Sequence, residues 1–148
     1  MGAGNLNLLK LCVGAEQVSD LTRWQARQAA MQAAAGRPVE HIHTTRMWPR
    51  REAELLDGGS MYWVFRGVIL ARQRIARLDR VTGEDEVSRC AIVLDREVIK
   101  TEMMLRRPFQ GWRYLTGVDA PGDLSAAGRQ DDDLPAGLSV ALADIGLR

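Results

Sequence analysis

The sequence contains few of the residues that mark secreted, membrane-bound or metal-binding proteins. Its 148 residues include only two cysteines and two histidines, which is too few for a disulfide framework and leaves a zinc site short of its usual ligands. No apolar run approaches the ~20 residues that a membrane span needs. The apolar stretch at residues 6–13 is interrupted by Lys10 and follows no basic region, unlike a signal peptide. We therefore expect a cytoplasmic protein with no membrane association.

The motifs of common enzyme classes are also missing. The sequence has no Walker phosphate loop, no Gly-x-Ser-x-Gly motif and no locally supported Cys–His nucleophile pair. Gly2 and Gly4 precede a predicted strand, whereas the glycines of a dinucleotide-binding loop follow one. The sequence therefore predicts no cofactor and identifies no catalytic residue, and it leaves open whether the protein is an enzyme.

What is present is the composition of one globular domain, with 46% hydrophobic and 26% charged residues. Residues 6–13 form a predicted strand. An Ala-rich helix is predicted at residues 20–35, with Ser19 as its N-cap and Gly36 at its end. The helical spacing of Leu21, Trp24 and Met31 places these three side chains on the inward face.

The central part of the chain predicts mainly strands, with one short helix at residues 50–56. Residues 68–81 fit a helix or a strand, and we favour a strand because a Gly-containing hairpin loop follows at residues 82–86. The fold class is therefore α+β: a mostly antiparallel, partly closed β-barrel with an N-terminal helix packed on it. The other predicted strands are residues 39–47, 61–66, 87–94 and 98–105, and a last strand within 106–115.

His41 and His43 lie on one face of the predicted strand 39–47. Two imidazoles at this spacing could hold a metal ion, but the sequence offers no third histidine and no nearby cysteine pair to complete the site. We favour two solvated strand histidines and predict no metal site.

The charges are unevenly distributed along the chain. Residues 1–115 carry 18 basic and 13 acidic side chains, whereas residues 116–148 carry two and six. All basic residues except Lys10 and Lys100 are arginines. We therefore expect a single α+β domain over residues 1–115, and an acidic Gly/Pro/Ala-rich tail over residues 116–148 that is weakly structured or docked.

Seven of the eight aromatic residues lie between Trp48 and Tyr114, a span that also contains most of the arginines. Aromatic faces stack on unpaired bases, and guanidinium groups bind phosphate. The sequence therefore predicts a binding module for nucleic acid or modified nucleotides, with RNA or a nucleotide as the expected ligand. Phosphate would be bound by Arg46, Arg50, Arg51, Arg72 and Arg74, a base would stack on Trp48 and Trp112, and polar base edges would be read by Gln110 and Arg113.

The same residues fit other interpretations. Tyr62, Trp63 and Phe65 have the pattern of core residues, and Trp48 and Trp112 could seal the ends of a barrel. Acidic residues at 52, 54 and 57 could neutralise Arg72 and Arg74 in a surface ion network. A protein-interaction or assembly surface is the main alternative function, because Trp, Tyr and Arg are favoured there too. A small enzyme acting on a phosphorylated ligand is the third, and the sequence does not specify an oligomeric state.

Five segments together resemble one bacterial protein family. They are residues 9–14 (LKLCVG), 45–51 (TRMWPRR), 55–64, 71–75 (ARQRI) and 107–115 (RPFQGWRYL). On these segments the chain is similar to the family known as domain of unknown function 1489, over about residues 5–124 and without the acidic tail. The order of helix, strands and closing aromatic segment also resembles the PUA-like superfamily, whose ASCH and EVE domains bind RNA or modified nucleotides, which implies a barrel-like fold.

Overall fold

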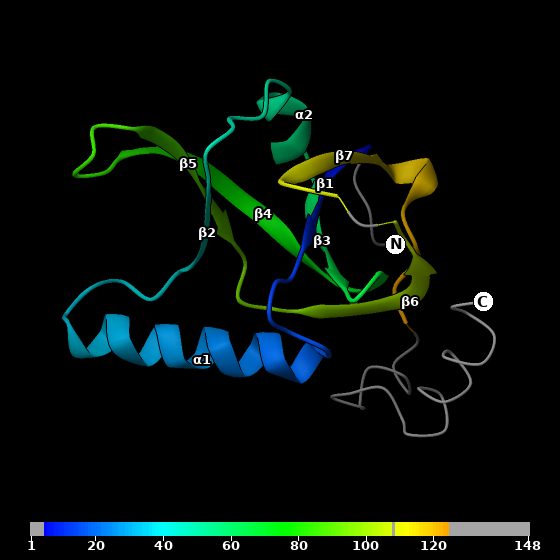
Figure 1. Cartoon of the computed structure of the whole chain (residues 1–148), viewed down its shortest axis with the longest axis horizontal. Helices are drawn as coiled ribbons and strands as arrows, with labels where there is room; N and C mark the ends of the chain where they lie inside the picture. Colours follow the sequence, from blue (N-terminus) through cyan, green and yellow to red (C-terminus); the bar gives the residue numbers. More distant parts are fainter. Residues whose placement is uncertain (1–4, 108, 125–148) are drawn as a thin grey trace.

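The computed structural model describes residues 5–107 and 109–124 of the chain (Figure 1). The described residues form seven strands, two α-helices and one short 3-10 helix, which establishes a mixed α+β fold. In chain order these are β1 (Leu6–Leu11), α1 (Val18–Ala34), β2 (His41–Thr45), α2 (Glu52–Leu56), β3 (Ser60–Phe65), β4 (Val68–Thr82), β5 (Ser88–Leu94), β6 (Ile99–Leu105), β7 (Trp112–Thr116) and the 3-10 helix (Gly117–Asp119). Neither helix in this part of the chain has the length and apolarity needed to cross a membrane.

The seven strands form one sheet, in which every pairing except the parallel β1–β3 pair is antiparallel. The strand order is β2-β5-β4-β3-β1-β7, and β6 pairs with β4. The long strand β4 organises the sheet, because its first half pairs with both β3 and β6 and its second half pairs with β5. The sheet does not close on itself, so the partly closed barrel that the sequence predicted is not confirmed.

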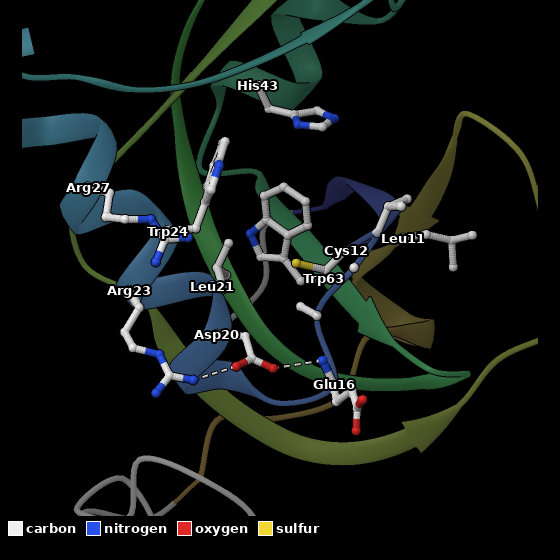
Figure 2. A pocket seen from close by; sticks show the side chains of 13 residues that line it. Leu11, Cys12, Glu16, Asp20, Leu21, Arg23, Trp24, Arg27, His43 and Trp63 are labelled. Atoms are coloured by element: carbon white, nitrogen blue, oxygen red, sulfur yellow. Dashed lines mark hydrogen bonds and ion pairs between the residues drawn. The ribbon is translucent and has the colours of Figure 1, made fainter. Parts of the chain in front are cut away.

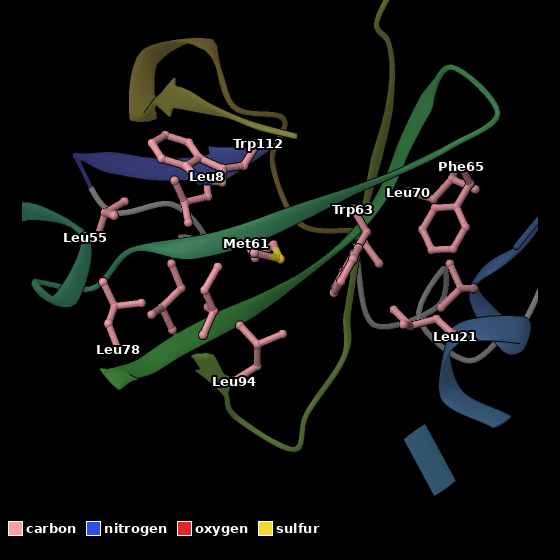
Figure 3. Close-up of a cluster of buried hydrophobic side chains, with 14 of the residues drawn as sticks. Leu8, Leu21, Leu55, Met61, Trp63, Phe65, Leu70, Leu78, Leu94 and Trp112 are labelled. Atoms are coloured by element: carbon pink, nitrogen blue, oxygen red, sulfur yellow. The ribbon is translucent and has the colours of Figure 1, made fainter. Parts of the chain in front are cut away.

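Alternating side chains of the strands form two apolar clusters. The larger cluster combines Met61, Trp63 and Phe65 of β3 with Leu21 of α1 and Leu55 of α2, so both helices cover the same face of the sheet (Figure 3). The smaller cluster contains Leu9, Tyr62, Val64, Ile69 and Leu115, and Phe109 and Ala120 pack against it. The alternation expected of strands with two buried faces places Tyr62 opposite Trp63.

Helix α1 contacts the sheet through few side chains. Its buried residues are Val18, Leu21 and Gln25. The helix begins two residues before the predicted start, because the Asp20 carboxylate accepts the backbone N–H groups of Glu16 and Gln17 at 2.9 and 3.3 Å and so caps the first turn. At the other end, the Gln32 side chain makes two hydrogen bonds of 2.9 Å to the backbone of Glu40, just before β2.

The predicted inward face of this helix is partly wrong. Leu21 is buried, but Trp24 is 39% exposed and Met31 is 63% exposed. The buried residues Val18 and Gln25 lie within about 60° of Leu21 on one side of the helix axis, whereas Trp24 and Met31 lie about 60–80° away on the other side, where α1 faces away from the core.

The chain after residue 115 is described as far as Leu124. Asp123 forms a bridge with Thr101 of β6 and an ion pair with Arg72 of β4, so this part of the predicted tail lies against the sheet. The rest of the predicted acidic tail, residues 125–148, lies outside the described residues.

We expect Gly59→Ala to destabilise the protein far more than Gly58→Ala. A Cβ atom on Gly59 would lie 2.5 Å from the carbonyl oxygen of Leu6 and closer still to that of Leu55, whereas one on Gly58 meets no atom within 4 Å. Overlap with two backbone groups forces β1 and α2 apart, and we expect it to lower the free energy of unfolding by several kcal/mol, roughly the upper range for point mutants. Gly58 has φ +84°, so alanine there should cost about 1 kcal/mol. Equal decreases in the free energy of unfolding for the two variants, measured by urea denaturation, would contradict this expectation.

Candidate functional site

The two Trp- and Arg-containing segments that the sequence predicted as a ligand site do meet in the structure. The indole N–H of Trp112 donates to the carbonyl oxygen of Met47 at 3.1 Å. The Tyr114 hydroxyl accepts the backbone N–H groups of Arg50 and Arg51 at 3.0 and 3.2 Å. These bonds join chain positions more than sixty residues apart, so the predicted contact between the segments is correct.

In this contact, however, the aromatic side chains have structural roles. Trp112 is buried in the larger apolar cluster and packs edge-on against Tyr114 at 4.9 Å between ring centroids. An indole in this position has no free face for a base, which corrects its predicted stacking role. Trp48 is half-buried, and the Arg80 guanidinium lies 5.0 Å from its ring centroid, in cation–π contact.

Several of the polar groups of these segments bind one another. Arg51 forms an ion pair with Glu54 at 2.6 Å and lies over the Tyr114 ring. Arg113 donates to the carbonyl oxygens of Gln110 and Trp112 at 2.7 and 3.0 Å. The remaining predicted contacts, Arg46, Arg50 and the Gln110 side chain, are exposed.

Arg72 and Arg74 do not join this surface. Arg72 is paired in register with Tyr62, on the sheet face opposite Trp63. It is buried and makes a two-pronged bond to Asp123, at 2.8 and 2.9 Å, and a third bond to Ser60 Oγ at 2.8 Å. A buried guanidinium paired in this way has a structural role, which corrects the predicted roles of Arg72 in phosphate binding and in pairing with the acidic residues at 52, 54 and 57. Arg74 is exposed.

A different part of the fold has the shape of a ligand site. A cleft of about 640 Å³ lies between α1, the β1–α1 loop and the middle of strands β2 and β3 (Figure 2). This volume is within the range of small-molecule pockets, roughly 300–1,000 Å³. Its aromatic lining is Trp24, Trp63 and His43, and its charged lining is Glu16, Asp20, Arg23 and Arg27. We call this the α1 cleft.

The Trp63 side of the α1 cleft is fixed by a buried amide pair. The indole N–H of Trp63 donates to Gln73 Oε1 at 2.9 Å. Gln73 and Gln25 exchange reciprocal amide hydrogen bonds at 2.8 and 3.1 Å, and Gln73 also donates to the carbonyl oxygen of Asp95 at 3.0 Å. Both amides are buried, so Trp63 has one defined orientation and α1 is held at one distance from the sheet.

His43 lies edge-on to Trp63, with ring centroids 5.3 Å apart and planes at 88°. The predicted sharing of one strand face by His41 and His43 is correct, but that face is turned inward and His43 is half-buried rather than solvated. Burial, assisted by the charge of Lys10, lowers the pKa of His43 to about 4, so the imidazole is neutral near pH 7. Its Nε2 is enclosed and makes no hydrogen bond within the described part of the chain.

Charges of opposite sign line different parts of the α1 cleft. Asp20 and Glu16 lie at the N-terminal end of α1, where Asp20 pairs with Arg23 at 2.6 Å and Glu16 with Arg66 at 3.5 Å. Hydrogen bonds from the Glu16 backbone and from Arg23 hold the pKa of Asp20 below its usual range. Cys12, between these groups and Trp63, is a poor nucleophile, because burial and the charge of Asp20 raise its pKa to about 11.

Among residues 5–107 and 109–124, no three His, Cys, Asp or Glu side chains come together as a metal site requires. His43 shares the α1 cleft with Arg23 and Arg27, and with none of the arginines that the sequence predicted for the ligand. Sequence analysis missed Trp24 because its helical spacing suggested packing. The available signal was Arg23 and Arg27 on either side of it, since guanidinium groups flanking an aromatic residue on a helix indicate an exposed face.

We expect the low pKa of His43 to make stability fall on mild acidification. An unfolded histidine has a pKa of about 6.5. Between pH 6.5 and pH 4, residue 43 is therefore protonated in the unfolded chain and neutral in the folded one. The resulting contribution is fully present above pH 6.5 and is lost as the pH falls towards 4, by about 2 kcal/mol between pH 8 and pH 5. Urea unfolding should show this loss, and His43→Gln should remove most of it. An equal loss in wild type and variant would contradict the assignment.

Comparison with known proteins places the chain in a family but gives it no further relatives. The family model described as protein of unknown function (DUF1489) matches residues 8–148. The match therefore continues through the acidic tail, which the sequence resemblance had left outside. No curated protein and no solved structure matches the chain, so the PUA-like resemblance has no support from known folds. The chain belongs to the DUF1489 family.

Proposed function

We propose that this protein is a binding module for a planar ring with polar edges, such as the base of a nucleotide or an unpaired base of RNA, and that the α1 cleft is its site. The observation that carries the proposal is the exposed indole of Trp24, which lines one cleft of about 640 Å³ together with the neutral imidazole of His43. Convergent aromatic groups with a few polar ones are the usual composition of a ligand pocket.

Trp24 supplies the exposed stacking surface, whereas Trp63 is only 2% exposed and forms a fixed wall of the cleft. Trp24 is 39% exposed although it is a large aromatic residue, and its indole lines the α1 cleft from the helix side (Figure 2). Trp63 lines the same cleft from the sheet side and is held by its bond to Gln73. Stacking of a base on an aromatic side chain contributes about 1–3 kcal/mol, and a ring held in advance by the fold loses little entropy on binding.

His43 supplies hydrogen-bonding capacity beside these rings. A neutral imidazole offers one donor and one acceptor, and the Nε2 of His43 has no partner among the described residues. A buried polar atom without a partner is uncommon and often indicates a ligand or water. Rotation about the last side-chain bond of histidine is soft, so the ring can turn a nitrogen towards the polar edge of a bound base.

The surface around Trp48 is the weaker candidate. Trp112 and Arg72 have structural roles, and Arg51 and Arg113 bind neighbouring groups. Arg46 and Arg50 stay predictions as phosphate contacts, and Trp48 stays a prediction as a stacking surface for a base, in a longer RNA chain. A protein-interaction role for this surface has one observation in its favour, the 57% exposure of Met47 next to Trp48. The PUA-like barrel also stays a prediction, and binding in the α1 cleft does not depend on it.

We expect Trp24→Ala to weaken binding of nucleotides by about tenfold or more, because one stacking surface of roughly 1–3 kcal/mol is lost. For the wild type, the affinity is measured from the change in intrinsic tryptophan fluorescence as the protein is titrated with each of the four common ribonucleoside monophosphates. Calorimetry measures it for the variant, which lacks one of the reporting indoles.

Met31→Ala is the matched control, because Met31 is an exposed apolar residue of the same helix and does not line the α1 cleft. It should bind as the wild type does. Equal weakening in both variants would mean that the helix, rather than the indole, was perturbed. Absence of binding by the wild type to all four nucleotides and to a short single-stranded RNA would reject the proposed function.

A further inference from the structure

Two arginines flank Trp24 on the exposed side of α1. Arg23 and Arg27 are separated by one helical turn and therefore project from the same side of the helix. Both line the α1 cleft together with Trp24, and Figure 2 shows the Arg27 side chain next to the Trp24 indole. Any ring that stacks on Trp24 therefore has guanidinium groups beside it.

The two guanidinium groups differ in what they bind. Arg23 is engaged by Asp20, at 2.6 Å. Arg66, the other arginine near the cleft mouth, lies 3.5 Å from Glu16. Arg27 is exposed and forms no salt bridge within the part of the chain that the structure describes. It is the lining cation that keeps its full capacity for an anion.

The charged side chains also make the two ends of the α1 cleft different. Asp20 and Glu16 lie at the N-terminal end of α1, and Arg27 is seven residues further along the helix than Asp20, about 10 Å at the usual rise. Both acids are paired with arginines, Asp20 with Arg23 and Glu16 with Arg66, so the unpaired charge that attracts an anion lies at the Arg27 end. A ligand with one anionic and one uncharged part is therefore favoured with its anionic part at Arg27.

Resting on the proposed function, we propose that the ligand of the α1 cleft is a phosphorylated nucleoside, with its base against Trp24 and its phosphate on Arg27. The guanidinium plane matches the oxygens of a phosphate and binds them by two parallel hydrogen bonds. Arg23 lies one turn away and adds positive charge, although Asp20 offsets it. The same chemistry is offered by a free nucleotide and by a nucleotide within single-stranded RNA.

The test compares each ribonucleoside with its 5′-monophosphate in calorimetric titrations of the full chain. For the wild type we expect the monophosphate to bind about tenfold more tightly, which corresponds to about 1.4 kcal/mol. Arg27→Gln should bind nucleoside and monophosphate with equal affinity. Arg37→Gln is the control, since Arg37 is also exposed and lies beyond the end of α1, outside the cleft; it should keep the tenfold difference.

The outcomes separate this inference from the function on which it rests. Equal binding of nucleoside and monophosphate by the wild type would overturn the phosphate site and leave the base site standing. Binding of neither, by a protein shown to be folded, would overturn both. A single-stranded RNA hexamer, titrated in the same way, identifies the source of the phosphate. Much tighter binding of the hexamer, lost in Arg27→Gln, assigns the site to RNA, and equal binding assigns it to the free nucleotide.

Discussion

The hydrogen bonds of one buried amide, that of Gln73, hold together the parts of this protein that could contact a ligand. Gln73 lies in the interior of β4, where its oxygen accepts from Trp63 and Gln25 and its nitrogen donates to Gln25 and to the carbonyl oxygen of Asp95. All of its hydrogen-bonding capacity is used, which is what makes an amide tolerable in a core. Strand, helix and the β5–β6 connection are thereby fixed around one side chain.

This arrangement explains why an open cleft exists beside α1. The helix has 17 residues but buries only Val18 and Leu21 as apolar groups, and its contact with the sheet is otherwise made by the Gln25–Gln73 pair. Packing by two leucine-sized side chains alone would let the helix settle more closely or at several angles. Reciprocal amide bonds have a fixed length and direction, so they hold the helix at one distance from β4 and leave Trp24 and His43 lining the cleft beside it.

The sequence predicted the local structure well because its signals are local. Alternating apolar residues, Gly83 in a hairpin and the glycine after the Ala-rich helix correctly placed β4, β5 and α1, and the contact between the Trp48 and Trp112 segments was also anticipated. The functional surface was not predictable in the same way. Arg72 is neutralised by Asp123, 51 residues away, and Trp24 faces a cleft because of the loop after β1. Such pairings depend on how distant elements meet, which periodicity and composition do not encode.

We assign the nucleotide contact to the exposed indole of Trp24 in the α1 cleft and not to the buried indole of Trp112. The chain has four tryptophans, so its indole N–H groups give four resonances in a ¹⁵N-resolved NMR spectrum. We expect a saturating ribonucleoside monophosphate to shift the resonance of Trp24 and to leave that of Trp112, which is bonded to Met47, in place. A spectrum in which Trp112 shifts while Trp24 stays fixed would contradict this assignment.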